Sequence, residues 1–295
     1  MTIAPHVSLD LDPAQVTHRL YTTLDLHRMG MTKRQIRDAV IGGTLLRARR
    51  GAYLVPGVPL AVAEAASDGG RLACISALAE WGVFVLAATR LHVHLDRAAH
   101  KESAGRRNTW HWGALIRTPH PRATTVHPID AVAQAVACQS ARAAIATLDS
   151  ALHLGLIDEG DLDAIFDRLP ARRRVLRGFI DGRSEAGSET LVRLMALSLG
   201  FRVDVQVVVP GVGRVDLVLD GWLVVECDSE QFHSGWASQK RDRRRDLALA
   251  VLGMTSIRPI AEDVFHHPEV IIAALIGLRE ARPAAQRASR RSAAR

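Results

Sequence analysis

The sequence predicts a multidomain α/β protein made of three modules. A helix-turn-helix pattern followed by a short hairpin pattern predicts an N-terminal winged helix-turn-helix over residues 1–60. An apolar helix followed by strands that carry acids indicates a C-terminal α/β module over residues 181–281. Residues 61–180 between them are expected to be mainly helical with a small sheet, and residues 282–295 to form a disordered basic tail.

Composition limits the classes of protein that need to be considered. Of the 295 residues, 48% are hydrophobic, which is ample for real cores, and the net charge of +7 favours a polyanionic or acidic partner. The cysteines are three in number, widely spaced and without metal-ligand spacing, which fits a reduced, cytoplasmic setting. Neither a secretory signal nor an apolar run long enough to span a bilayer is evident, so we expect no membrane association.

The first module is expected to contain two helices and a hairpin. A short helix precedes a capping-box signature, Thr32 with Gln35, which opens a second helix. The second helix ends at Ile41, before two glycines. The segment LLRARRGAYLV then predicts a hairpin with its turn near Arg50 and Gly51. This order of elements is typical of a winged helix-turn-helix.

Basic side chains gather on the exposed face of the second helix and on the hairpin. We expect them to contact the major groove, phosphates or the minor groove of DNA: Lys33, Arg34, Arg37, Arg47, Arg49 and Arg50. The whole pattern resembles the N-terminal domain of AbiEi-family antitoxins, including the run R-R-G-x-Y from Arg49 to Tyr53 at its end. That resemblance implies a defence or toxin-antitoxin context, with a protein partner there as a further expectation. Winged helices also serve as protein-docking modules, and this alternative stays open.

In the middle module, the sequence pattern predicts a helix pair over residues 61–81, strands near 91–95 and 109–112, and three helices between 125 and 169. It resembles the middle part of AbiEi-type proteins, and we expect it to space and orient the two ends. Its strands carry His92, His94 and His111. Because no carboxylate or cysteine completes a ligand set near them in the sequence, we expect exposed strand histidines and no metal site.

The C-terminal module contains a hairpin, RVDLVLDGWLVVECD, whose apolar strands are interrupted by Asp216, Glu226 and Asp228. A two-residue turn at Asp220 and Gly221 would put Asp216 and Glu226 on opposite faces of the sheet. A three-residue loop with Gly221 in the left-handed conformation places all three acids on one face and the apolar sets together. We expect the second register.

Clustered carboxylates on a half-buried face repel one another unless a cation neutralises them. Hard oxygen ligands with no neighbouring Cys or His cluster favour Mg2+ or Mn2+ over zinc. Glu189, in the first turn of the preceding apolar helix, reaches the same site if that helix packs across the hairpin. Positive charge follows the acids, which suits a phosphodiester substrate: Lys240, Arg241, Arg244, Arg245 and Arg258.

In their order along the chain these residues resemble a known group, the actinobacterial domains related to very-short-patch-repair endonucleases of the PD-(D/E)XK superfamily. The matching segments are Glu189 to Arg193, Asp216, Glu226 to Asp228, Phe232-His233, Asp242 to Asp246 and Ser256 to Arg258. The resemblance implies a restriction-endonuclease-like α/β/α core in which Asp216 and Glu226 bind the metal and Glu189 matches a helical Glu. It implies that His233 transfers a proton, with Asp228 standing where the superfamily usually has Lys. Arg245 and Arg258 would bind the phosphate or brace the acids.

The expected function is therefore a Mg2+-dependent DNA endonuclease with an N-terminal DNA-binding domain. A second interpretation is a DNA-binding regulator or antitoxin-like protein whose nuclease-like domain does not cut, and a third is an interaction module of a defence system. Simpler interpretations of single features also remain. Asp216 and Glu226 would then be surface acids, His233 a surface histidine, and the basic run a solvated helical face.

Overall fold

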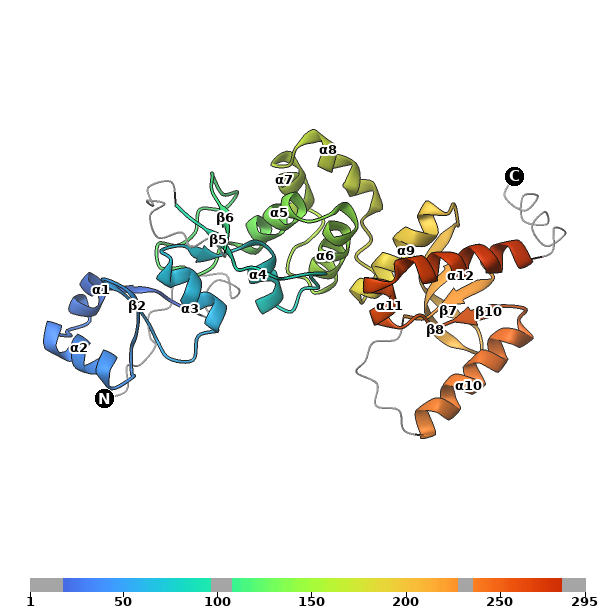
Figure 1. Ribbon diagram of the computed structural model, residues 1–295, viewed down its shortest axis with the longest axis horizontal. Helices are drawn as coiled ribbons and strands as arrows, with labels where there is room; N and C mark the ends of the chain where they lie inside the picture. The colour runs from blue at the N-terminus through green and yellow to red at the C-terminus, as the bar shows by residue number, and fades with distance from the viewer. Residues whose placement is uncertain (1–17, 97–107, 228–235, 283–295) are drawn as a thin grey trace. The chain divides into compact units, whose positions relative to one another are not determined.

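The computed structural model describes residues 18–96, 108–227 and 236–282, and it is a mixed α/β structure (Figure 1). The chain divides into two compact units. The first unit comprises Met1–Gln139 and Leu154–Arg174, and the second comprises Ser140–His153 and Val175–Arg295. In the described part of the chain, no helix is both long and apolar enough to cross a membrane.

The first unit begins with a three-stranded sheet and two helices. The elements are β1 (Tyr21–Thr22), α1 (Thr23–Arg28), α2 (Lys33–Ile41), β2 (Leu46–Arg49) and β3 (Ala52–Leu54), and the sheet order is β1-β3-β2. Helix α2 starts at a full capping box, in which Thr32 and Gln35 satisfy each other's backbone N–H, as the sequence predicted. The helices pack on the sheet through Leu26, Ile36 and Tyr53.

The rest of the first unit is mainly helical around a second small sheet. Its elements are α3 (Leu60–Ser67), β4 (Arg71–Leu72), α4 (Cys74–Glu80), β5 (His92–His94), β6 (Thr109–His111), α5 (Pro128–Cys138), α7 (Asp161–Asp167) and α8 (Ala171–Arg174). The strand order is β4-β5-β6, with β5 and β6 parallel. Helices α4 and α5 contact each other beside this sheet.

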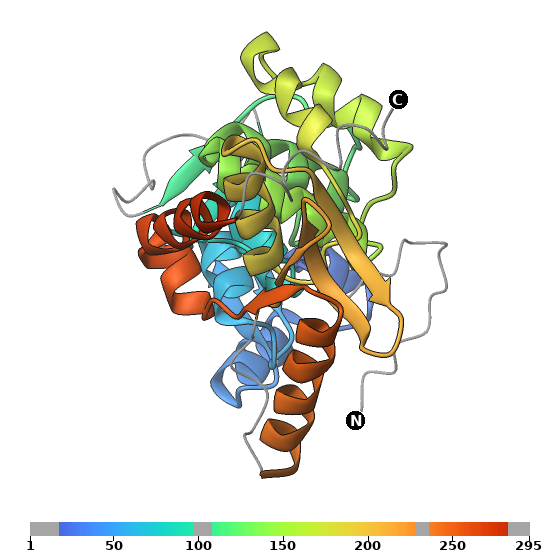
Figure 2. The ribbon, with the colours of Figure 1, turned by 90° about the vertical axis from the view of Figure 1, so that its right-hand side faces the viewer.

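The second unit is built on a four-stranded sheet. Its elements are α6 (Ala141–His153), η3 (Val175–Phe179), α9 (Gly187–Ser198), β7 (Val203–Val209), β8 (Gly213–Leu219), β9 (Leu223–Val225), α10 (Trp236–Val251), β10 (Thr255–Ile257), α11 (Ala261–His266) and α12 (Pro268–Ala281). The sheet order is β10-β9-β8-β7, with β10 parallel to β9 and the other pairs antiparallel. Helices α9 and α12 lie on one side of the sheet and α10 on the other (Figure 1), and β7 and β8 form the long amber hairpin of Figure 2.

The hairpin of β8 and β9 has the expected register. Leu219 pairs with Leu223 and Leu217 with Val225, so the connecting loop has three residues. Gly221 adopts a left-handed backbone with φ 67°, and the preceding Asp220 does so too, with φ 47°. The Asp220 side chain accepts the backbone N–H of Arg202, the residue before β7, at 3.0 Å, and this contact helps to hold the turn.

Candidate functional site

The register of the second unit places Asp216 and Glu226 side by side. Leu217 pairs with Val225, so the next position along both strands brings Asp216 opposite Glu226 on the same face. Both side chains are half-buried. The Asp216 carboxylate accepts a 2.8 Å hydrogen bond from the Cys227 backbone N–H, which fixes one of its oxygens.

Glu189 reaches this region from the first turn of α9. Its side chain is only 4% exposed, and one carboxylate oxygen accepts hydrogen bonds from the Glu185 backbone N–H at 3.0 Å and from Gln206 at 2.9 Å. Burial and the nearby negative charge of Asp216 raise the pKa of Glu189 to about 7. A carboxyl in this state binds either a proton or a cation readily near neutral pH.

Gln206 is a member of this group that the sequence did not predict. It lies in the middle of β7, opposite Asp216 between the pairs Val205 with Leu217 and Val207 with Val215. Its φ of 53° is rare for a residue other than glycine within a strand. Its side-chain amide donates to Glu189, while its Oε1 is buried without a hydrogen-bond partner. The alternation of β7 gives no signal of this backbone conformation.

Two arginines hold the other acid. Arg245 of α10 and Arg258, which follows β10, each bond a different oxygen of Glu226, the second at 3.1 Å. Arg258 also bonds Asp246 at 2.9 Å. Both arginines therefore contact acidic side chains in this structure, as the bracing role requires.

The remaining C-terminal candidates are less fully described. Asp228 and His233 lie outside the described residues, as does the side chain of Arg241. Lys240 and Arg244 are exposed on α10. They are free to meet solvent or a polyanion, but the structure does not bring them into contact with the acids.

In the first unit, basic residues line a hollow between α2 and the turn of the β2–β3 hairpin. Lys33 and Arg37 contribute from the helix, and Arg47 and Arg50 from the hairpin. Arg34 and Arg49 are exposed nearby. Within α2 the charge is partly offset, because Arg34 and Arg37 lie 3.7 Å and 3.3 Å from the single carboxylate of Asp38.

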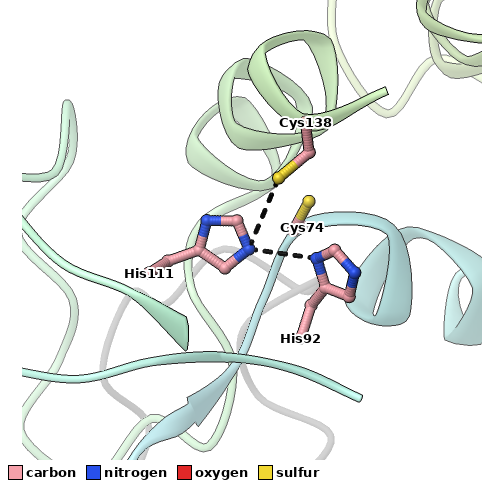
Figure 3. A group of neighbouring side chains, drawn as sticks. All are labelled: Cys74, His92, His111 and Cys138. Carbon is pink, nitrogen blue, oxygen red and sulfur yellow. Dashed lines mark hydrogen bonds between the residues drawn. The ribbon is translucent and has the colours of Figure 1, made fainter. Parts of the chain in front are cut away.

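The strand histidines differ from the sequence prediction. His92 and His94 are buried, at 7% and 2% exposure, and are not the exposed residues expected. His92 and His111 face Cys74 and Cys138, and all four donor atoms lie within 4.8 Å of one another (Figure 3). The sequence showed no such ligand set because the cysteines come from α4 and α5, far along the chain from both strands.

Comparison with known proteins gives relatives but no family. No family model matches the chain. It is 28% identical over 254 residues to the uncharacterized protein Rv2248 of Mycobacterium tuberculosis strain H37Rv, covering 81% of this chain and 93% of that protein. The uncharacterized protein MT2308 of strain CDC 1551 matches to the same extent. The similarity therefore extends through both compact units without naming an activity.

Proposed function

We propose that the protein is a metal-dependent DNA endonuclease whose second unit hydrolyses phosphodiesters. The observation that carries the proposal is the cross-strand placement of Asp216 beside Glu226, with Glu189 brought to the same region by α9. A layered α/β/α unit with acids at these positions is what the resemblance to very-short-patch-repair endonucleases implies. The chain's net charge of +7 is suited to a nucleic-acid substrate.

The chemistry of the acid group fits Mg2+ or Mn2+. Glu189 is a buried carboxyl whose pKa is raised by burial and by Asp216, and a cation would relieve both effects. The buried Oε1 of Gln206 is a further hard acceptor with no hydrogen-bond partner. Asp216, Glu226 and Glu189 would hold the ion, with Asp228 beside them in sequence. When bound, the metal supplies an activated water and stabilises charge on the scissile phosphate.

The chain's own residues supply positioning and binding. Arg245 and Arg258 fix the carboxylate of Glu226 from two elements, which sets the direction of its oxygens. Exposed Lys240 and Arg244 on α10 bind backbone phosphates next to the acids. His233 moves the proton, as the sequence resemblance implies. The hollow lined by Lys33, Arg37, Arg47 and Arg50 docks duplex DNA through the winged helix.

A second candidate function is a DNA-binding regulator or antitoxin-like protein whose nuclease-like unit does not cut. One observation favours it. Glu226 is ion-paired with both Arg245 and Arg258, so its negative charge is compensated without any cation. A carboxylate held in this way is stable as a purely structural group.

A nicking assay on supercoiled plasmid separates the two candidates, because both expect DNA binding and only one expects catalysis. Full-length protein should nick plasmid with Mg2+ or Mn2+ and not with EDTA. Asp216→Ala and Glu226→Ala should lower the rate by at least about 100-fold, since the metal supplies both nucleophile and charge stabilisation. His233→Ala should cost roughly 10²- to 10⁴-fold, the usual value of general acid-base help.

The matched control is Asp204→Asn, which alters an exposed acid of the same sheet that pairs at 3.6 Å with Arg202 on the surface. Its nicking rate should equal that of the wild type. If purified protein binds DNA yet cleaves neither plasmid nor single-stranded or mismatched DNA with either metal, the nuclease proposal fails and the regulator takes its place.

A further inference from the structure

A second group of ligand-type side chains lies in the first unit, apart from the proposed nuclease acids. It consists of two cysteines and two histidines: Cys74, His92, His111 and Cys138. Within the part of the chain that the structure describes, it is the only group of three or more such residues whose donor atoms lie within 4.8 Å of one another. Figure 3 shows His111 facing both Cys138 and His92, with the Cys74 sulfur beside them.

The distances match the size of a tetrahedral zinc site. His92 Nδ1 and His111 Nε2 are 3.0 Å apart, and Cys138 Sγ and His111 Nε2 are 4.0 Å apart. Zinc bonds of about 2.3 Å to sulfur and about 2.0 Å to nitrogen require ligand separations of roughly 3.3–3.8 Å at tetrahedral angles. Both measured separations lie within about 0.5 Å of this range, and all four donor atoms lie within 4.8 Å of one another, close enough to share one ion after a small adjustment.

The donor set also selects the ion. Thiolate sulfur is a soft ligand that Mg2+ and Ca2+ do not favour, whereas two sulfurs with two imidazole nitrogens form a common tetrahedral set for Zn2+. All four tetrahedral positions are filled by protein side chains. A site of this closed kind is structural, because no position is left for a reacting water.

Each donor comes from a different element. Cys74 is the first residue of α4, His92 begins β5, His111 ends β6 and Cys138 ends α5. One ion bound by all four would fasten the small sheet to the two helices beside it. This is useful here because β4 and β5 pair over only two residues and β5 and β6 over three.

The backbone around Cys74 is held in an unusual conformation. Its φ is 51°, in the left-handed region that residues other than glycine rarely adopt, and at the start of a helix. Its N–H donates to the Gln134 side chain at 3.1 Å, which replaces a helix cap. The Ser76 hydroxyl likewise accepts the His92 N–H at 2.9 Å. The surrounding structure thus fixes two ligand residues by direct hydrogen bonds.

We propose that Cys74, His92, His111 and Cys138 form a structural Zn2+ site that ties the small sheet of the first unit to α4 and α5. The proposal does not depend on the nuclease function, because it involves different residues in a different compact unit.

The test is the metal content of full-length protein purified under reducing conditions without added metal. Mass spectrometry of the native protein, with elemental analysis, should find about one zinc per chain. Replacement by Co2+ should give the intense visible absorption of tetrahedral cobalt together with a sulfur-to-cobalt charge-transfer band. Cys138→Ser, which changes an exposed ligand, should lose at least about 90% of the zinc and lower the melting temperature.

Two control variants match the ligands. Cys227→Ser removes the remaining cysteine, and His153→Gln removes an exposed histidine at the end of α6. Both should keep one zinc per chain. The wild-type cobalt spectrum tests the proposal even if a ligand variant fails to fold. Wild-type protein without zinc that also gives no thiolate-cobalt band would overturn it.

Discussion

Glu189 is the residue in the proposed nuclease site with the clearest consequence for stability. Its pKa is raised from 4.5 to about 7, first by burial and then by Asp216, so the folded state binds its proton more tightly than the unfolded chain does. The stabilisation is complete below pH 4.5 and is lost as the pH rises towards 7. Without divalent metal, the free energy of unfolding of the wild type should therefore fall as the pH rises from 4.5 towards 7. Relative to the Glu189→Gln variant, the fall should be up to about 1.4 kcal/mol per pH unit.

Urea denaturation at several pH values measures this difference. Glu269→Gln, which changes a 71% exposed acid on α12, should keep the wild-type profile. Parallel profiles for wild type and Glu189→Gln would show that the carboxyl does not titrate in this range. Added Mn2+ should flatten the wild-type profile if the carboxylate is a ligand, because a cation lowers its pKa.

Sequence reasoning anticipated that Asp216 and Glu226 share a face, and it missed the grouping of two cysteines with His92 and His111 for a physical reason. The pairing of Asp216 with Glu226 follows from strand alternation and one turn, both of which are local. Cys74 and Cys138 meet the histidines only after α4 and α5 pack together, and no local pattern encodes that packing. The left-handed backbone of Gln206 is likewise set by tertiary context.

At the scale of elements, α6 is joined to α9 by a buried ion pair. Asp149 and Arg193 are 2.8 Å apart, with side chains only 1% and 6% exposed. Thr190 and the Asp181 N–H also donate to Asp149, and Arg193 donates to the Phe179 carbonyl. Arg193→Met removes one partner and leaves a buried carboxylate, so it should destabilise the second unit by about 3–5 kcal/mol.

Chemical denaturation followed by circular dichroism measures this cost. The matched change Arg202→Met removes a surface arginine that is 69% exposed, and should cost less than about 1 kcal/mol. Equal effects of the two substitutions would contradict a buried, stabilised pair. The pair could not be foreseen from the pattern TLVRLMALS, which shows an apolar helix but not which helix its arginine meets.

Helix ends were the most predictable elements. The capping box at Thr32 and the turn near Gly51 each depend on residues close together in the sequence, and the structure contains both. The parallel pairing of β5 with β6 depends on a crossover and has no comparable signature.

For the whole molecule, the division of the chain was harder to infer than its elements. The sequence suggested a boundary near residue 180. In the structure, α6 belongs to the same compact unit as the C-terminal elements, whereas α7 and α8, which follow it in the chain, belong to the first unit. The chain thus passes between the units more than once. Sequence composition can indicate a linker. It does not indicate that a helix packs in a different unit from the helices next to it in the chain, as α6 does by packing on α9.

The excess of basic residues is also a property of the whole chain, and two arginine pairs distinguish general attraction from local docking. Arg37 and Arg47 line the hollow between α2 and the β2–β3 hairpin, whereas Arg172 and Arg174 are exposed on α8. Each double change to Ala removes the same net charge from the full-length protein.

If the hollow docks duplex DNA, Arg37→Ala with Arg47→Ala should remove two phosphate contacts. Each contact contributes roughly 0.9 to the slope of log affinity against log salt concentration, so the slope should become smaller in magnitude by about two. Arg172→Ala with Arg174→Ala should leave the slope nearly unchanged. Fluorescence anisotropy across a salt series measures both slopes. Equal losses in the two variants would mean that net charge, and not the hollow, determines binding.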